Sequence, residues 1–383
     1  MRILFLVPYP TGEAPSQRFR FEQYFELLKK NNIDFSVSSF WNLRAWVILY
    51  RPGKIFEKLF WLCTGFFKRS LDLFKAIGFD LIFIHRECAP LGPPVFEFIL
   101  SKILRKKIIY DFDDAIWLAN TSQENQLAAW AKFHGKVKYI CEWSHVVSCG
   151  NAWLAEYAKL FNANTIINPT TIDTENLHNP LLFKENSKNS SEIQIASSPR
   201  NDERVFRVDQ KIKADRLVIG WTGTHSTIGY LNTLLPILQS IEKKYPITIR
   251  IISNKDPQLP LQSVEFFPWK KETEIADLLT FEIGIMPLTD DEWAKGKCGF
   301  KALQYMALGI PCIASPVGVN REIISHDLNG FLCSTHLEWE AGLERLITDH
   351  TLRNRLGQEA RETVEKNYSV SSNSTNFFSL TRS

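Results

Sequence analysis

Short apolar runs alternate with helix-like segments along this chain, and no other feature limits its fold as strongly. Arg2–Val7 and Leu81–Ile84 have the length and composition of buried strands, whereas Phe21, Phe25 and Leu28 are spaced as on one helix face. Strands that alternate with helices are typical of parallel sheets, because each helix carries the chain back to the start of the next strand. The alternation therefore predicts a doubly wound α/β fold.

The alternation is present in both halves of the chain, whose 383 residues have the length of about two domains. The other expected strands are Asp34–Phe40, Ile108–Tyr110, Val146–Ser148, Thr165–Ile167, Leu217–Trp221, Ile247–Ile252, Val264–Phe267, Ile283–Met286 and Pro311–Ser315. One helix is expected to bury Leu231, Leu234, Leu235, Leu238 and Ile241. We expect two doubly wound domains, 1–175 and 211–358, that face each other across a cleft. A polar linker is expected at 176–210, and a C-terminal helix at about 360–383 is expected to pack back on the first domain.

Charge and cysteine content exclude several classes of protein. The chain has 45 Lys and Arg against 42 Asp and Glu, a net charge of +3, which is too small for a nucleic-acid binder. Its seven cysteines are odd in number and form no C-x-x-C pair, which argues against a disulfide framework and a zinc site. This cysteine pattern suits a reducing cytoplasm. The first apolar run is too short for a signal peptide, and no apolar run approaches the roughly 20 residues of a spanning helix.

The segment 297–322 has the strongest pattern of chemistry in the chain. Gly299 and Gly318 each stand just before an expected helix, whose first backbone N–H groups can hold a phosphate. The helix that starts at Phe300 presents Lys301 and Gln304 close together. This pattern indicates a phosphate-containing ligand.

The same segment resembles the donor-binding region of group 1 (family 4) retaining glycosyltransferases, which have the GT-B fold of two Rossmann-like domains. The resemblance rests on Gly299, the run Met306–Pro311 and Glu322, and covers about residues 217–335. Gln304 stands where the family has the Glu that binds the nucleotide ribose, and Gly296 stands at the other Glu position, which touches the donor sugar. The resemblance implies that 211–358 binds a nucleotide-sugar donor and that 1–175 binds the acceptor. The donor-site residues expected are Gly223, Thr224, His225, Ser226, Thr227, Lys297, Gly299, Phe300, Gln304, Gly318, Val319, Asn320 and Glu322.

The turn 219–228 is a second candidate phosphate site, because a strand ends there in small and hydroxyl residues. Gly223 allows close approach of a phosphate to the backbone, and Thr224, Ser226 and Thr227 can donate hydrogen bonds to it. The family places an Arg and a Lys here, whereas this chain has only His225 as a potential cation. An ordinary helix cap explains the turn equally well.

Charged residues follow three expected strands of the first domain. Arg18 and Arg20 can face an anionic acceptor or donor phosphate, or they can be two solvated arginines of a helix. His85, Arg86 and Glu87 follow the strand 81–84 and complete the candidate acceptor side.

Three carboxylates, Asp111, Asp113 and Asp114, follow the strand 108–110. One of Asp113 and Asp114 is expected to cap a helix, and the other is expected to orient an acceptor hydroxyl together with Asp111. With Lys301, which can stabilise the leaving diphosphate, they are the candidate catalytic residues. Two close carboxylates also suggest a metal, but a metal is not expected, because neither a His nor a third acid stands at ligand spacing from such a pair.

Residues 41–75 combine aromatic and basic side chains. Seven Lys and Arg stand against Glu57 and Asp72, a local charge of 7 − 2 = +5. A basic, aromatic segment of this kind is typical of a bilayer interface. The alternative is a set of helices that pack on the first sheet with their basic side chains extended to solvent.

The function expected is transfer of a sugar from a nucleoside-diphosphate sugar to a saccharide or lipid-linked acceptor, with retention of configuration. No cofactor or metal is expected, no nucleic acid is expected as partner, and the protein is expected in the cytoplasm or peripherally on the inner face of its membrane. The alternatives are a GT-B protein that binds nucleotide or glycan without transfer, and another GT-B enzyme such as a nucleotide-sugar epimerase.

Overall fold

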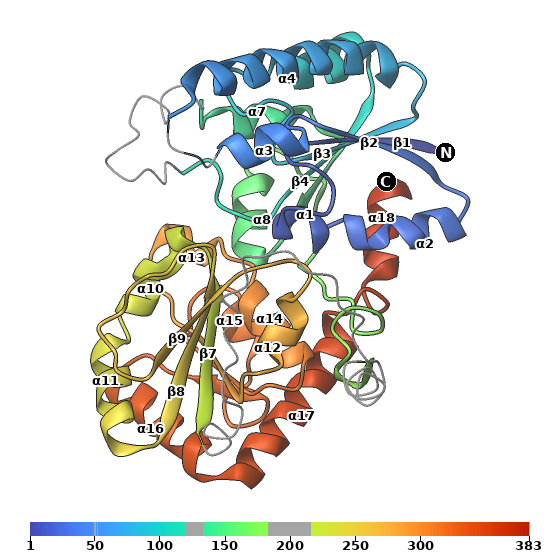
Figure 1. The fold of residues 1–383 in the computed structure, drawn as a ribbon. Helices are drawn as coiled ribbons and strands as arrows, with labels where there is room; N and C mark the ends of the chain where they lie inside the picture. Colours follow the sequence, from blue (N-terminus) through green and yellow to red (C-terminus); the bar gives the residue numbers. More distant parts are fainter. Residues whose placement is uncertain (50, 52, 119–132, 183–215, 383) are drawn as a thin grey trace, which may run out of the picture. The chain divides into compact units, whose positions relative to one another are not determined.

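The computed structural model describes residues 1–49, 51, 53–118, 133–182 and 216–382. The expected linker 176–210 lies mostly outside these residues. The chain divides into two units, each with its own sheet (Figure 1). The first unit consists of Met1–Thr171, Asp290–Phe300 and Asn367–Ser383, and the second of Ile172–Thr289 and Lys301–Lys366. The structure thus places 290–300 in the first unit, whereas the sequence analysis assigned all of 211–358 to the second domain.

The first unit is built on six parallel strands in the order β2-β1-β3-β4-β5-β6. The strands are β1 (Arg2–Val7), β2 (Asp34–Ser39), β3 (Leu81–His85), β4 (Lys107–Phe112), β5 (Val146–Cys149) and β6 (Thr165–Ile167). Its helical segments are α1 (Pro15–Arg18), η1 (Glu22–Tyr24), α2 (Phe25–Lys30), α3 (Leu43–Leu49), α4 (Ile55–Ala76), α5 (Val95–Phe98), η2 (Ile99–Ile103), α7 (Lys136–Trp143), α8 (Ala152–Lys159), α13 (Glu292–Lys295) and α18 (Ser374–Arg382).

Both faces of the first sheet are buried, because successive side chains of a strand point to opposite sides. Along β1, Leu4 and Leu6 belong to one apolar core, whereas Ile3, Phe5 and Val7 belong to another. The second of these cores also contains Phe377 and Leu380 of α18. A sheet covered on both sides exposes its strand ends, where polar residues can gather.

The second unit also has six parallel strands, in the order β12-β11-β10-β7-β8-β9. The strands are β7 (Leu217–Gly223), β8 (Ile247–Ser253), β9 (Val264–Pro268), β10 (Ile283–Met286), β11 (Cys312–Ala314) and β12 (Gly330–Leu332). Its helical segments are η5 (His225–Thr227), α10 (Ile228–Asn232), α11 (Leu235–Lys244), α12 (Glu274–Leu278), α15 (Asn320–Ile323), α16 (His336–Thr348) and α17 (His350–Asn367). Helix α14 (Phe300–Ala307) begins at the last residue of the first unit's middle segment.

The strands agree with those expected to within a few residues, and two details of the second unit differ. The single helix expected over Leu231–Ile241 is two helices, α10 and α11. Pro236 lies in the first turn of α11, where a missing amide hydrogen is tolerated, and it cannot continue a preceding helix. The sequence analysis also missed β12, whose three residues are too few to form a recognisable pattern.

Candidate functional site

In each sheet, chain connections run in opposite directions from one pair of neighbouring strands. In the first sheet these strands are β1 and β3, and in the second they are β7 and β10. Doubly wound sheets bind ligands beyond the carboxyl ends of such a pair. Most residues singled out from the sequence lie at or near these two places.

In the first unit, a group of charged side chains lies beyond β3 and β4. Arg86 donates to Asp113 Oδ1 from Nε (2.9 Å) and Nη2 (2.7 Å), and to Asp114 Oδ2 (3.0 Å). Lys297 Nζ donates to Asp114 Oδ1 at 2.8 Å. These four side chains keep 14–22% of their surface exposed. We call Arg86, Asp113, Asp114 and Lys297 the charged cluster.

The charged cluster favours the ionised form of Asp114. Burial by itself would raise the pKa of Asp114, but the charges of Lys297 and Arg86 outweigh burial and lower it. Burial, with the charges of Glu87 and Asp113, raises the pKa of Tyr9. Arg86 has φ +60°, a left-handed conformation that is uncommon for a side chain of this size. Backbone strain of this kind is concentrated at functional sites.

Asp111 does not take part in the charged cluster, and this corrects the role assigned to it. Asp111 lies inside β4, and its side chain is completely buried. Its Oδ2 accepts from His85 Nδ1 (2.9 Å) and Arg20 Nε (3.3 Å), and its Oδ1 accepts from Ser148 Oγ (2.6 Å) and Arg20 Nη2. Both oxygens are occupied away from solvent, so this geometry does not suit contact with an acceptor hydroxyl.

Arg20 and His85 are corrected for the same reason. Arg20 is 1% exposed and His85 is fully buried, so neither forms an acceptor-side surface. Among the described residues, His85 Nε2 has no hydrogen-bond partner. Burial by itself would raise the pKa of Asp111, but Arg20 and His85 overcome that effect and hold it well below its ordinary value.

The remaining acceptor-side residues have ordinary contacts within the first unit. Arg18 is partly buried, and its guanidinium lies 4.9 Å from the centre of the Phe19 ring. Glu87 pairs with Lys136 at 2.6 Å. Neither residue joins the charged cluster, so the structure brings Arg86 together with Asp113 and Asp114 but leaves Arg18 and Glu87 apart from them.

In the second unit, the turn after β7 is a compact, self-bonded structure. A Cβ at Gly223 would lie 2.5 Å from Trp221 Cη2 and 2.8 Å from Thr227 Oγ1, so only glycine fits here without a shift. Thr227 Oγ1 donates to Thr224 O at 2.9 Å. This requirement for glycine arises from packing and does not depend on a ligand.

Three residues of the same turn, Thr224, His225 and Ser226, are exposed. His225 donates its backbone N–H to Asn254 Oδ1 at 2.8 Å, and Ser226 Oγ lies 2.8 Å from Thr224 Oγ1. The segment that follows is a short 3-10 turn, η5, and then the five residues of α10. The structure therefore has no long helix directly behind this turn, in contrast to the expectation.

The loop after β11 contains the second glycine turn. Gly318 has φ +53°, the left-handed region that glycine enters without strain. Val319 is buried and Glu322 is exposed. Asn320 is fully buried, and its Nδ2 donates to Ser315 O at 3.0 Å. Among the described residues, Asn320 Oδ1 has no hydrogen-bond partner.

Residues 299–301 lie where the chain passes from one unit to the other. Gly299 has φ +68°, and the Phe300 ring packs on Phe19 within the first unit, with 4.5 Å between ring centres. Lys301 belongs to the second unit, where its Nζ lies 5.7 Å from the centre of the Trp221 ring. Of the two lysines expected near the donor diphosphate, Lys301 therefore belongs to the second unit. Lys297 belongs to the first unit, where it pairs with Asp114.

Gln304 and Gly296 occupy the two positions at which the sequence departs from the family. Gln304 is 2% exposed, and its Nε2 lies 3.4 Å from Glu274 Oε1 and 3.4 Å from His178 Nε2. A Cβ at Gly296 would lie 2.9 Å from Ala115 Cβ and 3.0 Å from Ala115 N. Close packing therefore excludes a larger side chain from position 296 in this arrangement.

Sequence reasoning missed several residues of these sites. Tyr9 joins the surroundings of Arg86, and Ser148 donates to Asp111. Both stand at or just beyond the end of a strand, which is a signal that could have found them. Glu274 lies near Gln304 through the fold alone, since 30 residues separate them in the chain.

The described residues form neither a metal centre nor a membrane-spanning helix. Within the described ranges, no group of three or more His, Cys, Asp or Glu side chains could hold a metal ion. In those same ranges, no helix is long and apolar enough to cross a membrane.

Comparison with known proteins identifies the class of fold first. Sucrose-phosphate synthase from Thermosynechococcus elongatus aligns over 100% of this chain and 98% of its own, with a TM-score of 0.66 and 15% identity. Anabaena HepE, solved in complex with UDP, aligns over the whole of both chains with a TM-score of 0.61 and 16% identity. The two six-stranded parallel sheets are those of the GT-B fold.

A match to a known family covers part of the second half of the chain. Residues 258–363 match the model of the group 1 glycosyl transferases, so the chain carries a region of that family, as the resemblance predicted. N-acetyl-alpha-D-glucosaminyl L-malate synthase of Bacillus anthracis is 31% identical over 102 residues, which are 26% of this chain and 25% of that protein. The match thus spans about a quarter of the curated relative.

Proposed function

We propose that this protein transfers a sugar from a nucleoside-diphosphate sugar to a saccharide or lipid-linked acceptor. The proposal rests on the carboxyl edge of the second sheet, where the turn at Gly223 and the loop at Gly318 lie on either side of β10. The family match includes the loop at Gly318. HepE, which has the same fold, was solved with UDP and with UDP-glucose, and this supports a nucleotide sugar as donor.

In this proposal, the second unit stabilises the leaving diphosphate. Backbone N–H groups at Gly318 and Val319 and the ammonium of Lys301 face the charge that develops on the phosphate oxygen as the sugar leaves. Gln304 stands at the family's ribose position, and its buried amide is held close to Glu274. Neither step needs a metal or an organic cofactor, and we expect activity to persist in excess EDTA.

The charged cluster of the first unit is proposed to orient the acceptor. Asp113 and Asp114 are partly exposed, so their carboxylate oxygens can accept hydrogen bonds from sugar hydroxyls. Their partners Arg86 and Lys297 fix the directions of their oxygens. By its family resemblance the enzyme retains the anomeric configuration, with the leaving phosphate oxygen as the base that deprotonates the acceptor.

The first experiment measures donor binding and turnover. Calorimetry with UDP, GDP and ADP identifies the nucleotide, and incubation of their sugars with a membrane extract reveals a product by mass spectrometry. The anomeric coupling constant of that product reports retention or inversion. Zero affinity for all three nucleotides, together with no product, would refute the proposal.

Two variants with matched controls assign the diphosphate contacts. Lys301→Gln removes one charge-assisted contact, worth about 1.5–3 kcal/mol, so nucleotide-diphosphate affinity should fall by at least about tenfold. Lys244→Gln is the control, because Lys244 ends α11 just before β8 begins, at the opposite edge of the sheet. Gly318→Ala should also weaken binding, and Gly92→Ala, another left-handed glycine (φ +80°), should not.

A protein that binds nucleotide or glycan without transfer is the competing candidate. Gly296 favours it, because the packing of Ala115 leaves no room for the Glu that touches the donor sugar in the family. Nucleotide binding without product from any donor would select this candidate.

We also propose a setting for the reaction. Synthesis of a cell-surface polysaccharide or glycolipid would place the acceptor at the inner face of the cytoplasmic membrane, and residues 41–75 would hold the protein there. All seven cysteines are free thiols, which fits a cytoplasmic location. Fractionation of cells that produce the protein should recover it from both cytosol and membranes, with release from membranes by high salt.

A further inference from the structure

The face of helix α4 that carries the ion pair of Arg69 and Asp72 is directed toward the first sheet. The side chains of both residues are buried, and Arg69 Nη1 lies 2.8 Å from Asp72 Oδ2. Arg69 donates to three backbone carbonyls of the first unit, those of Val7 (2.6 Å), Ser38 (2.9 Å) and Cys88 (2.7 Å). These contacts tie the helix to the ends of the strands.

The same inner side fixes the rotation of α4 by close packing. Gly65 lies against the Phe40 ring, and a Cβ at that position would overlap the ring. Asp72 also accepts from Ser38 Oγ at 2.6 Å. Because Gly65, Arg69 and Asp72 lie on one face, the opposite face of α4 must point away from the sheet. Figure 1 shows α4 as the long helix on the outer side of the first unit.

That outward face carries an apolar row. Its members recur every three or four residues: Phe56, Phe60, Cys63, Phe67, Leu71 and Phe74. The side chains of Phe56, Phe67 and Phe74 are 88%, 67% and 74% exposed. We call these six residues the outer row. A contiguous row of exposed phenylalanines marks an interaction surface, since scattered single residues would need no explanation.

The charge around the outer row decides which partner fits. Arg69 and Asp72 neutralise each other inside, and Lys54 pairs with Glu57 at 2.7 Å, so the excess of five positive charges over 41–75 comes from other side chains. These are Arg44, Arg51, Lys58, Lys68 and Lys75, of which Lys68 and Lys75 donate to Ser39 O and Ser36 Oγ of β2 and so border the outer row on its sheet side.

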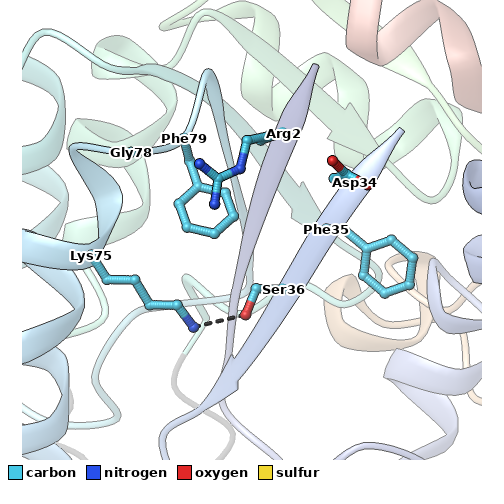
Figure 2. A pocket seen from close by; sticks show the side chains of 7 residues that line it. All are labelled: Arg2, Asp34, Phe35, Ser36, Lys75, Gly78 and Phe79. Carbon is cyan, nitrogen blue, oxygen red and sulfur yellow. Dashed lines mark hydrogen bonds between the residues drawn. The ribbon is translucent and has the colours of Figure 1, made fainter. Parts of the chain in front are cut away.

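At the C-terminal end of α4, a hollow of about 490 Å³ adds cationic groups (Figure 2). Lys75, which follows Phe74, donates to Ser36 Oγ at 2.7 Å, and Arg2 stacks 4.8 Å from the centre of the Phe79 ring. Asp34 is the acidic residue among those that line the hollow. These two cations lie at the C-terminal end of α4 on the side toward β1 and β2, where they can meet the phosphates of lipid head groups at the border of a bilayer that contacts the outer row.

We propose that the outer row docks on an anionic lipid bilayer, with α4 parallel to the surface and its phenylalanines at the boundary of head groups and acyl chains. A second copy of the chain fits less well, because a symmetric pairing through this face would bring the basic side chains that border the outer row of each copy close together. The proposal rests on the membrane part of the proposed function and is independent of sugar transfer.

The experiment measures binding of the full chain to vesicles by co-sedimentation. One set of vesicles is phosphatidylcholine alone, and the other contains about a third phosphatidylglycerol, a composition that gives a negative surface. We expect binding to the anionic vesicles that weakens as salt is raised, and at least tenfold weaker binding to the neutral ones. Phe56→Ser, Phe67→Ser and Phe74→Ser combined should reduce affinity for anionic vesicles by at least tenfold.

The matched control is the double variant Leu160→Ser and Leu337→Ser, which removes exposed apolar side chains (73% and 79%) outside α4 and should bind as the parent does. An environment-sensitive dye on Cys63, the exposed cysteine, should shift to the blue when anionic vesicles are added. Hydrogen exchange of peptides from the first sheet confirms that the first unit of the triple variant is folded, and nucleotide binding, measured by calorimetry, tests the donor site separately.

Three results would overturn the proposal. One is unchanged vesicle binding by the triple variant, and another is equal binding of the parent to neutral and anionic vesicles. The third is a dimer that the triple variant dissociates, without vesicle binding, which would assign the outer row to a second copy. Vesicle binding without any nucleotide affinity would leave this proposal standing and remove the proposed transferase function.

Discussion

Replacement of Asp111 by Asn should destabilise the first unit by about 3–5 kcal/mol, the cost of removing one partner from a buried ion pair. Asp111 and Arg20 are both fully buried, and the carboxylate accepts from Arg20, His85 and Ser148. An Asn side chain keeps the shape of Asp but has only one acceptor oxygen. Its NH2 group would therefore point at groups that now donate to the second carboxylate oxygen. The guanidinium of Arg20 then stays buried without a counter-charge.

The pH dependence gives this prediction a definite sign. The folded state holds the pKa of Asp111 well below its ordinary value, so the unfolded state binds the proton first as pH falls. The stabilisation from this carboxylate is therefore fully present at neutral pH and is lost below the ordinary aspartate pKa of about 4. The Asn variant has no carboxylate at position 111 that could be protonated. The free energy of unfolding of the parent should therefore fall toward that of the variant as pH falls below about 4.

Hydrogen exchange measured by mass spectrometry on the peptide that contains β4 reports the opening free energy of the first unit. This local readout matters because two units need not unfold together. Asp290→Asn is the control, since its side chain is 64% exposed, and it should change stability by less than about 0.5 kcal/mol. A loss of less than about 1 kcal/mol for Asp111→Asn at pH 7 would refute the reasoning from burial.

Three further predictions concern packing, helix ends and thiols. Gly220→Ala should lower the free energy of unfolding by about 1–3 kcal/mol, because the new Cβ would overlap a core phenylalanine ring. Gly229→Ala should raise it by about 0.5–1 kcal/mol, because Gly229 lies in a helix and has open space around it. Urea denaturation compares the two variants with the parent. Thr335→Ala should cost about 1 kcal/mol by removing the capping box of α16, and a drop in melting temperature would check it. A disulfide reagent should modify Cys63 rapidly in the folded protein and the six buried thiols only after unfolding. The reason is that burial raises the pKa of those six thiols and so disfavours the reactive thiolate. Fast reaction of more than one thiol in the folded protein would contradict this prediction.

How far the site could be predicted from the sequence depends on the range of the interactions that build it. The segment 297–322 carried its own signal, because a glycine turn, a helix and a strand follow one another within it. The charged cluster was found only in part: Asp113 and Asp114 were expected at a strand end, but Lys297, which pairs with Asp114, comes from 183 residues further along the chain. Arg20 and Asp111, 91 residues apart, were expected at a surface and are instead a buried pair.

The sequence by itself determined the two parallel sheets, since the lengths of apolar runs and helix-like segments are local properties that each stretch carries alone. Only the tertiary structure decided which charged residues are buried. Asp111 and Asp113 are two residues apart, yet one lies inside β4 and the other beyond its end. Tertiary contacts likewise turned Arg69 and Asp72 of α4 inward, where strand carbonyls satisfy the guanidinium, and left Phe56, Phe67 and Phe74 outside. Burial of a charge depends on partners supplied from distant parts of the chain, and no local pattern contains them.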